Sequence, residues 1–172
     1  MSRLSRRAII ASAAALPTLA VQAVALTNGR LAGKPTNAAA DATTEAIAAV
    51  MKCLDDFMNA WNAHDLKALH DAMNFPHVRL NGDNALRVSF PSDMTQEIFE
   101  RMQKTVPSIQ GWHHSGWAKR EIVAASPNKV HIQTRFVRYR ADNSVLSSFD
   151  ALYVVTKENG HWGVRMRSSF AP

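Results

Sequence analysis

The sequence predicts an α+β fold, in which N-terminal helices pack on one face of a curved, mostly antiparallel sheet. Three segments with apolar residues at helical spacing precede Pro107, and alternating apolar and polar residues fill the chain after Gly111. Helices gathered early and strands gathered late are typical of α+β domains. The expected order is α-α-β-β-α-β-β-β-β, in the form of a cone-shaped roll.

The first helix is the strongest periodic signal in the chain. It is expected to start near Asp41 and to end before Asn62. Its apolar positions, three and four residues apart, are Ile47, Val50, Met51, Leu54, Phe57, Met58 and Trp61. Asp65 then caps a short second helix, which carries Leu66, Leu69 and Met73 on one face.

A hairpin and a third helix follow. Residues 76–80 and 85–90 alternate apolar with polar side chains around an Asn-Gly-Asp-Asn turn at 81–84. Residues 91–93 open a third helix that stops at Pro107.

The last part of the chain predicts four strands, separated by turns at 126–128, 141–143 and 158–160. If the last two turns are three-residue loops, Asn143 and Gly160 take the left-handed position. Even-numbered residues then share the face that the helices cover. That face comprises Val130, Ile132, Phe136, Leu146, Leu152, Val154, Trp162, Val164, Met166 and Phe170.

Asp150 is an anomaly in this apolar face. The register places it between Thr134 and Ser168 on the flanking strands. A carboxyl group that loses water there would have its pKa raised, which makes it a candidate acid or base. The alternative is a structural Asp held by the two hydroxyls or by Arg120 or Arg138. A two-residue turn at either hairpin would move Asp150 to the other face.

Seven histidines invite a metal site, but no pair has the helical or strand spacing of zinc ligands, so we expect neither metal nor cofactor. His77 and His114 are candidates for a second acid-base group, and hydrogen-bonded histidines at the core or rim are the alternative. Aromatic residues are expected mostly in the core, with some lining a cavity. The expected substrate-binding residues are Phe57, Trp61, Trp112, Thr134, Arg138 and Ser168.

The first 42 residues predict export and a linker. An Arg6-Arg7 pair precedes an apolar run that ends in Ala-Val-Ala at 23–25, which predicts a signal peptide over 1–25 and a linker over 26–42. The start resembles a twin-arginine export signal, and a general secretory signal is the alternative. The predicted location is the periplasm or outside a bacterial cell, with no membrane anchoring after cleavage.

The net charge of +6 is concentrated in that leader. From residue 43 onward, 15 Lys and Arg face 13 Asp and Glu. Because binding to phosphate backbones needs concentrated positive charge, we expect no nucleic-acid partner. Cys53, the only cysteine, lies among apolar helical neighbours and is interpreted as a packed side chain.

The element order, the segment Phe57–Leu66 and the closing Gly160–Arg165 resemble the nuclear transport factor 2-like superfamily, especially its SnoaL-like and ketosteroid-isomerase-like branches. The resemblance covers about residues 43–170 and implies a domain over 43–172 with one internal pocket. It places the oxyanion-binding acid of ketosteroid isomerases on Asp150. The family's tyrosine falls on Phe57 and its base near Gly82, so two of three catalytic positions differ.

Two functions therefore stay open. The first is an enzyme for isomerisation, cyclisation or dehydration of a small, largely hydrophobic molecule, with Asp150 and His77 or His114 exchanging protons. The second is a non-catalytic periplasmic binding or assembly module. The odd-numbered sheet face could also pack against a second copy, through Val137, Tyr139, Phe149, Tyr153 and Val155.

Overall fold

The computed structural model describes residues 37–105 and 109–172. The elements are α1 (Asn37–Asn62), α2 (Leu66–Asp71), β1 (Met73–Leu80), β2 (Leu86–Ser89), the 3-10 turn η1 (Pro91–Asp93), α3 (Gln96–Thr105), β3 (His114–Ser126), β4 (Lys129–Tyr139), β5 (Val145–Glu158) and β6 (His161–Ser169). This order is the predicted one. The proposed export signal lies outside the described residues, and the expected linker is already helical from Asn37.

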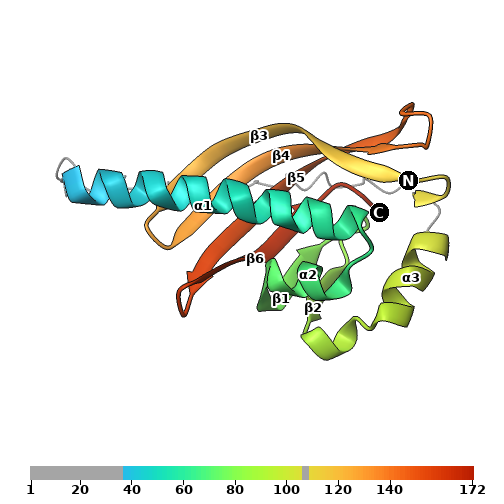
Figure 1. The fold of residues 1–172 in the computed structure, drawn as a ribbon, viewed down its shortest axis with the longest axis horizontal. Coiled ribbons are helices and arrows are strands. Elements are labelled where there is room, and N and C mark those ends of the chain that lie inside the picture. Colours follow the sequence, from blue (N-terminus) through green and yellow to red (C-terminus); the bar gives the residue numbers. More distant parts are fainter. Residues whose placement is uncertain (1–36, 106–108) are drawn as a thin grey trace, which may run out of the picture. The chain divides into compact units, whose positions relative to one another are not determined.

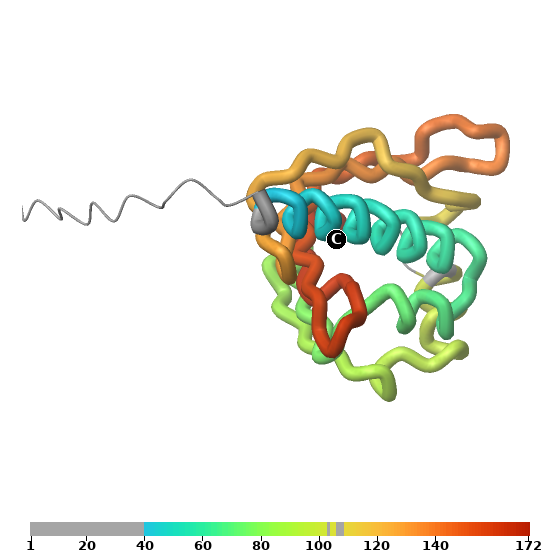
Figure 2. Tube along the Cα trace, turned by 60° about the vertical axis from the view of Figure 1, so that its left-hand side comes forward, coloured from blue at the N-terminus to red at the C-terminus, as the bar shows by residue number. Residues whose placement is uncertain are grey.

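The six strands form one sheet in the order β2-β1-β6-β5-β4-β3 (Figure 1). Among these strands, only the pairing of β1 with β6 is parallel. Figure 1 shows α1 crossing β3 to β6, with α2 next to β1 and β2. In Figure 2, α1 runs between the β3–β4 hairpin and the segment that holds α2 and α3. The predicted α+β fold, with helices packed on a mostly antiparallel sheet, is confirmed.

The core lies between α1 and the central strands. The apolar stripe of α1 buries Val50, Leu54 and Phe57 against Ile132 and Val155. Asp65 caps α2 as predicted, because its carboxylate accepts a hydrogen bond from the Ala68 amide at 2.9 Å. None of the helices in the described ranges is long and apolar enough to cross a membrane.

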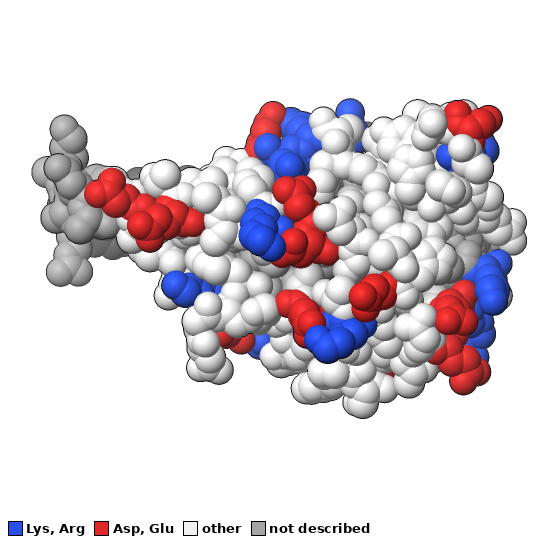
Figure 3. Space-filling model, viewed as in Figure 1, with Lys and Arg blue, Asp and Glu red and all other residues white. Residues whose placement is uncertain are grey.

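Charges are mixed on the face that carries α1. Figure 3 shows Lys and Arg beside Asp and Glu in small groups on this face. The helices α1 and α2 carry the exposed ion pairs Lys52–Asp56 and Lys67–Asp71, each at 2.6 Å. The face drawn therefore presents no continuous positive surface.

The hairpin between β4 and β5 starts in the predicted register and then leaves it. Asn143 has a left-handed φ of 65°, and Arg140 bonds Ser144 across the loop, as expected for three residues. One strand position further on, Tyr139 faces Val145 but Arg138 faces Ser147. This β-bulge reverses which residues of β5 face the helices.

The hairpin between β5 and β6 does not have the predicted three-residue loop. Glu158 pairs with His161, so the turn consists of Asn159 and Gly160 alone, both with positive φ. A further register shift follows between Val155 and Val154. As a result Ala151, Tyr153 and Val155 are buried on the helix side, whereas Leu152 and Phe170 are exposed.

The predicted position of Asp150 is therefore wrong. Asp150 pairs with Arg135 rather than Thr134, on the outer face, and the two side chains form a bidentate ion pair at 2.9 and 2.8 Å. Hydrogen bonds from Arg135 lower the pKa of Asp150 below its ordinary value. The proposed acid role required Asp150 to lie on the helix side with a raised pKa. Its observed environment lowers the pKa instead.

His114 also lies on the other face from the one expected. The β3–β4 turn has two residues, and two register shifts follow it, so His114 pairs with Tyr139 while Ser115 pairs with Arg138 on the helix side. The His114 ring stacks on Tyr139 with centroids 4.9 Å apart. The odd-numbered patch expected for self-association is likewise broken up, because Tyr153 and Val155 lie in the core.

Candidate functional site

A cavity of about 480 Å³ lies between the helices and the sheet, and we call it the inner cavity. Its apolar wall comes from α1, β1, α3 with the turn before it, and the central strands. The main apolar lining residues are Phe57, Met58, Trp61, Met73, Phe75, Met94, Ile98, Met102, Phe136 and Tyr153. A mostly apolar hollow with a few polar groups is the usual form of a small-molecule site.

Hydrogen bonds fix the wall near the end of α1. The Asn62 side chain donates to the Ser115 carbonyl at 2.9 Å and accepts from the Ser115 amide at 2.8 Å. Trp112 Nε1 donates to Ser115 Oγ at 2.8 Å. Trp61 packs edge-on against Trp112 and Phe99, so its ring is held rigidly at the cavity wall.

Three arginines form a row across neighbouring strands on the cavity side, and we call Arg87, Arg79 and Arg167 the arginine row. Arg79 of β1 pairs with Arg87 of β2 on one side and with Arg167 of β6 on the other. Arg167 pairs in turn with Tyr153 of β5. All four side chains line the inner cavity.

Burial and like charge both act on these arginines. Burial, followed by the charge of Arg167, lowers the pKa of Arg79 from 12.5 to about 10. The same two causes lower the pKa of Arg138, also in the lining, to about 10. Both side chains keep their positive charge at neutral pH, in a place where that charge is unfavourable.

Aromatic rings make cation–π contacts with two arginines of the cavity. The guanidinium carbons of Arg138 and Arg167 lie 5.6 and 5.1 Å from the centre of the Phe136 ring. Arg167 also lies 5.8 Å from the ring centre of Tyr153. Such cation–π contacts orient a guanidinium, but they leave its N–H groups able to bind an acceptor.

His77 is the predicted catalytic residue that the structure brings into the cavity. Its Nδ1 lies 3.1 Å from the Val164 carbonyl, which fixes the ring and leaves Nε2 as an acceptor when Nδ1 carries the proton. Burial lowers its pKa from 6.5 to about 4. His77 is therefore a neutral imidazole at pH 7.

Among the predicted substrate-binding residues, Phe57, Trp61 and Arg138 line the inner cavity. Trp112 supports Trp61 from behind, and Thr134 is buried with its hydroxyl donating to the Ala151 carbonyl at 3.2 Å. Ser168 pairs with Leu152, which is on the exposed face. These three, with Asp150 and His114, are not in the lining.

Sequence reasoning missed Arg79, Arg167, Tyr153 and His70, which all line the cavity. Arg167 and Tyr153 were expected on the outer face because the bulges have no signature in the sequence. For β1 a signal existed, because His77, Arg79 and Asn81 alternate with apolar residues. The alternation by itself did not show which side faces the cavity, and the structure places its polar residues in the lining.

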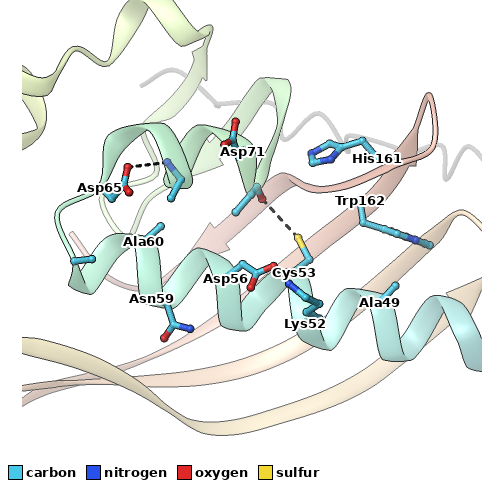
Figure 4. Close-up of a pocket in the computed structure, with 13 residues that line it drawn as sticks. Ala49, Lys52, Cys53, Asp56, Asn59, Ala60, Asp65, Asp71, His161 and Trp162 are labelled. Carbon is cyan, nitrogen blue, oxygen red and sulfur yellow. Dashed lines mark hydrogen bonds and ion pairs between the residues drawn. The ribbon is translucent and has the colours of Figure 1, made fainter.

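A second hollow, the outer groove, lies between α1, α2 and the start of β6 and measures about 600 Å³ (Figure 4). Several of its polar groups already have partners within the protein. Lys52 binds Asp56, and Cys53 donates to the Ala72 carbonyl at 3.6 Å. Burial raises the pKa of Cys53 to about 12, so the thiol is not a nucleophile at neutral pH.

The described residues do not form a cluster of the usual metal ligands. Within 37–105 and 109–172, no group of three or more His, Cys, Asp or Glu residues could hold a metal ion. The titratable groups of the inner cavity are mainly cationic or neutral, which suits an anionic or neutral organic ligand better than a cation.

The comparisons with known proteins concern the same region. The family model described as NTF2-like protein (DUF6841) matches residues 45–169. Searching the curated proteins gives no match.

Several solved structures share the fold. An NTF-2 like protein of unknown function from Shewanella oneidensis MR-1 has 17% identity and a TM-score of 0.55, over 72% of this chain and 98% of that one. An NTF2-like protein of unknown function from Pseudomonas putida KT2440 has 15% identity and a TM-score of 0.58, over 75% and 88%. A ketosteroid isomerase-like protein from Erwinia carotovora atroseptica SCRI1043 has 14% identity and a TM-score of 0.51, over 73% and 95%. Such low identities establish the fold alone.

Proposed function

The chain belongs to the NTF2-like protein family DUF6841, and on that premise we propose that its inner cavity binds a small, largely hydrophobic molecule. The cavity itself carries the proposal. A volume of about 480 Å³ with a mostly apolar lining fits a molecule the size of a substituted aromatic ring or a medium-length fatty chain. An apolar surface left to water at this scale is costly, and a ligand that fills it would recover that cost.

Thermal shift tests the binding proposal. The natural protein is heated with a panel of small hydrophobic acids, ketones and phenols, and a ligand at 100 times its Kd should add about 2.7 kcal/mol of stability. Met94→Trp fills part of the cavity and should abolish the shift. Val123→Trp is the matched control, because Val123 is 61% exposed and does not line the cavity. If no probe shifts the melting temperature, or if Met94→Trp responds like the natural protein, the binding proposal is wrong.

Catalysis is the second candidate function, and His77 is the observation that favours it. An imidazole with a free Nε2 inside an apolar cavity could accept a proton during isomerisation, cyclisation or dehydration. A pKa of about 4 makes it a weak base, so such a step would need an acidic proton on the substrate. Incubation of bound probes followed by NMR would test this, with His77→Gln as the comparison. Probes recovered unchanged favour the binding function.

Export is a separate proposal that rests on the sequence of residues 1–25. We propose that this segment directs the folded domain out of the cytoplasm by the twin-arginine route and is removed near Leu26. Replacing Arg6 and Arg7 with lysines should leave the precursor in the cytoplasmic fraction. Export of that variant at the normal rate would favour the general secretory alternative.

A further inference from the structure

We infer that the ligand of the inner cavity is an organic oxyanion, whose charged group lies against the arginine row and whose apolar part fills the remaining space. This inference rests on the proposed binding function and adds the chemical class of the ligand. Carboxylates and phosphate monoesters share the chemistry that the arginines recognise.

The placement of the arginine row is the first observation. Like charges directly opposite each other on neighbouring strands are destabilising, and here Arg79 has an arginine on each side. Arg138 adds a further positive charge that acts on both Arg167 and Arg79. An anion between these guanidinium groups would turn the repulsion into attraction.

Hydrogen bonding is the second observation. Six enclosed polar side-chain atoms have no hydrogen-bond partner among the described residues, and four of them belong to residues that line this one cavity. These four atoms are His70 Nε2, Arg79 Nε, Asn81 Oδ1 and Arg167 Nε. Buried polar groups in native proteins are nearly always satisfied, so the two unpartnered arginine Nε–H donors indicate a missing acceptor, whereas Asn81 Oδ1 is itself an acceptor and would need a donor.

The other arginines of the chain provide the contrast. Arg120, Arg135 and Arg165 each form an ion pair with an acid, at 2.7, 2.8 and 3.2 Å. No ion pair between described residues involves Arg79 or Arg167. Among the described residues, three arginines outside the cavity therefore pair with acids, whereas Arg79 and Arg167 do not.

The two acidic side chains in the lining do not fill this role. Asp83 accepts a hydrogen bond from the Ala85 amide at 2.9 Å, and Asp93 accepts one from the Phe90 amide at 2.7 Å. Each therefore holds one carboxylate oxygen on the backbone of an exposed turn, and no ion pair between described residues joins either acid to an arginine. Neither is among the main charges that shift the pKa of Arg79 or Arg138.

The apolar wall limits which anions fit. Phe75, Met94 and Ile98 offer nothing to a fully hydrated inorganic ion, so an oxyanion attached to a hydrophobic body gains from both parts of the lining. A guanidinium also matches the two oxygens of a carboxylate or phosphate in a fork geometry. The ligand class is therefore an aromatic or aliphatic acid or a phosphate monoester.

Calorimetry with matched probes tests the inference. The probes are 4-propylbenzoate, 4-propylphenyl phosphate and the neutral 4-propylbenzamide, titrated into the natural protein at fixed pH and ionic strength. We expect at least one oxyanion to bind tenfold or more tightly than the amide. The stronger of the two oxyanions identifies the headgroup as carboxylate or phosphate.

Three variants assign the preference to the row. Arg167→Gln and Arg79→Gln should each lower the affinity for the oxyanion at least tenfold and change that for the amide less than twofold. Arg135→Gln, on the outer face, should change neither. Testing two row positions keeps the experiment decisive if one variant does not fold.

The outcomes separate the two proposals. If the amide binds as tightly as both oxyanions, or if the two row variants keep the preference, the oxyanion inference is overturned and the binding function stands. If neither these probes nor the neutral hydrophobic panel bind to the folded protein, the binding function fails as well.

Discussion

Replacing Arg79 with methionine should stabilise the ligand-free protein, which is unusual for a substitution in a partly buried site. Methionine keeps the length and flexibility of the apolar stem and removes the charge. The pKa of Arg79 falls from 12.5 to about 10, and at about 1.4 kcal/mol per pKa unit the charged form costs the fold about 3 kcal/mol. Lost packing of the guanidinium on its neighbours offsets part of this, so we expect a gain of about 1–3 kcal/mol.

Chemical denaturation in urea at pH 7 measures this gain. Because the folded pKa lies below the unfolded one, the cost is fully present at neutral pH and disappears as the pH rises above the unfolded value of 12.5. The difference between variant and natural protein should therefore be constant from pH 6 to pH 8. Arg135→Met is the control, and it should not stabilise because it breaks the surface ion pair with Asp150. An Arg79→Met protein less stable than the natural one by more than about 1 kcal/mol would refute the reasoning. A loss of that size is expected only if other groups already compensate the charge of Arg79.

Three further outcomes follow from single residues. Stability should fall by up to about 3 kcal/mol as the pH drops from 6.5 to 4, because the unfolded chain takes up a proton that the buried His77 ring, with a pKa of about 4, does not. Urea titrations should show a shallower decline in His77→Gln, and an identical decline would exclude His77 as the cause. Cys53 should react with a thiol reagent only in denaturant, because burial raises its pKa to about 12, and rapid labelling of the native protein would contradict its placement. Gly163→Ala should destabilise the fold by several kcal/mol, because a Cβ would lie 2.6 Å from the Met73 carbonyl carbon on the paired strand β1. A melting temperature within 2 °C of the natural one would contradict this and show that the two strands can move apart.

The sequence was sufficient for the order of the elements because each carries a local signal. The stripe of α1, the Asp65 cap and the left-handed Asn143 are properties of a few neighbouring residues. Local signals also placed Phe57 and Trp61 on the inner face of α1, where they line the cavity.

The site was predicted less well than the order of the elements. Which face of the sheet a strand residue lies on depends on the number of residues in the turn and in both strands of the hairpin. One extra residue in β5 moves Asp150 from the helix side to the outer face and brings Tyr153 inward. Four register shifts and two two-residue turns lie between β3 and β6, and the register shifts have no fixed sequence signature.

Arg79 of the arginine row was missed for a different reason. Binary patterning assumes that the apolar side of a strand faces inward, and β1 places His77, Arg79 and Asn81 toward the cavity instead. Places where patterning fails are typically functional sites, since a polar group turned inward costs stability unless something binds it. That cost is the physical link between the failed prediction and the proposed ligand.

A crystal structure of the natural protein with 4-bromophenylacetate would test the central claim most directly. The anomalous signal of bromine locates the apolar end, and the refined density locates the carboxylate. We predict the bromine within the inner cavity and the carboxylate oxygens within hydrogen-bond distance of Arg79 and Arg167. An acid bound only in the outer groove, or bound in the inner cavity with its carboxylate turned away from the arginine row, would contradict the account.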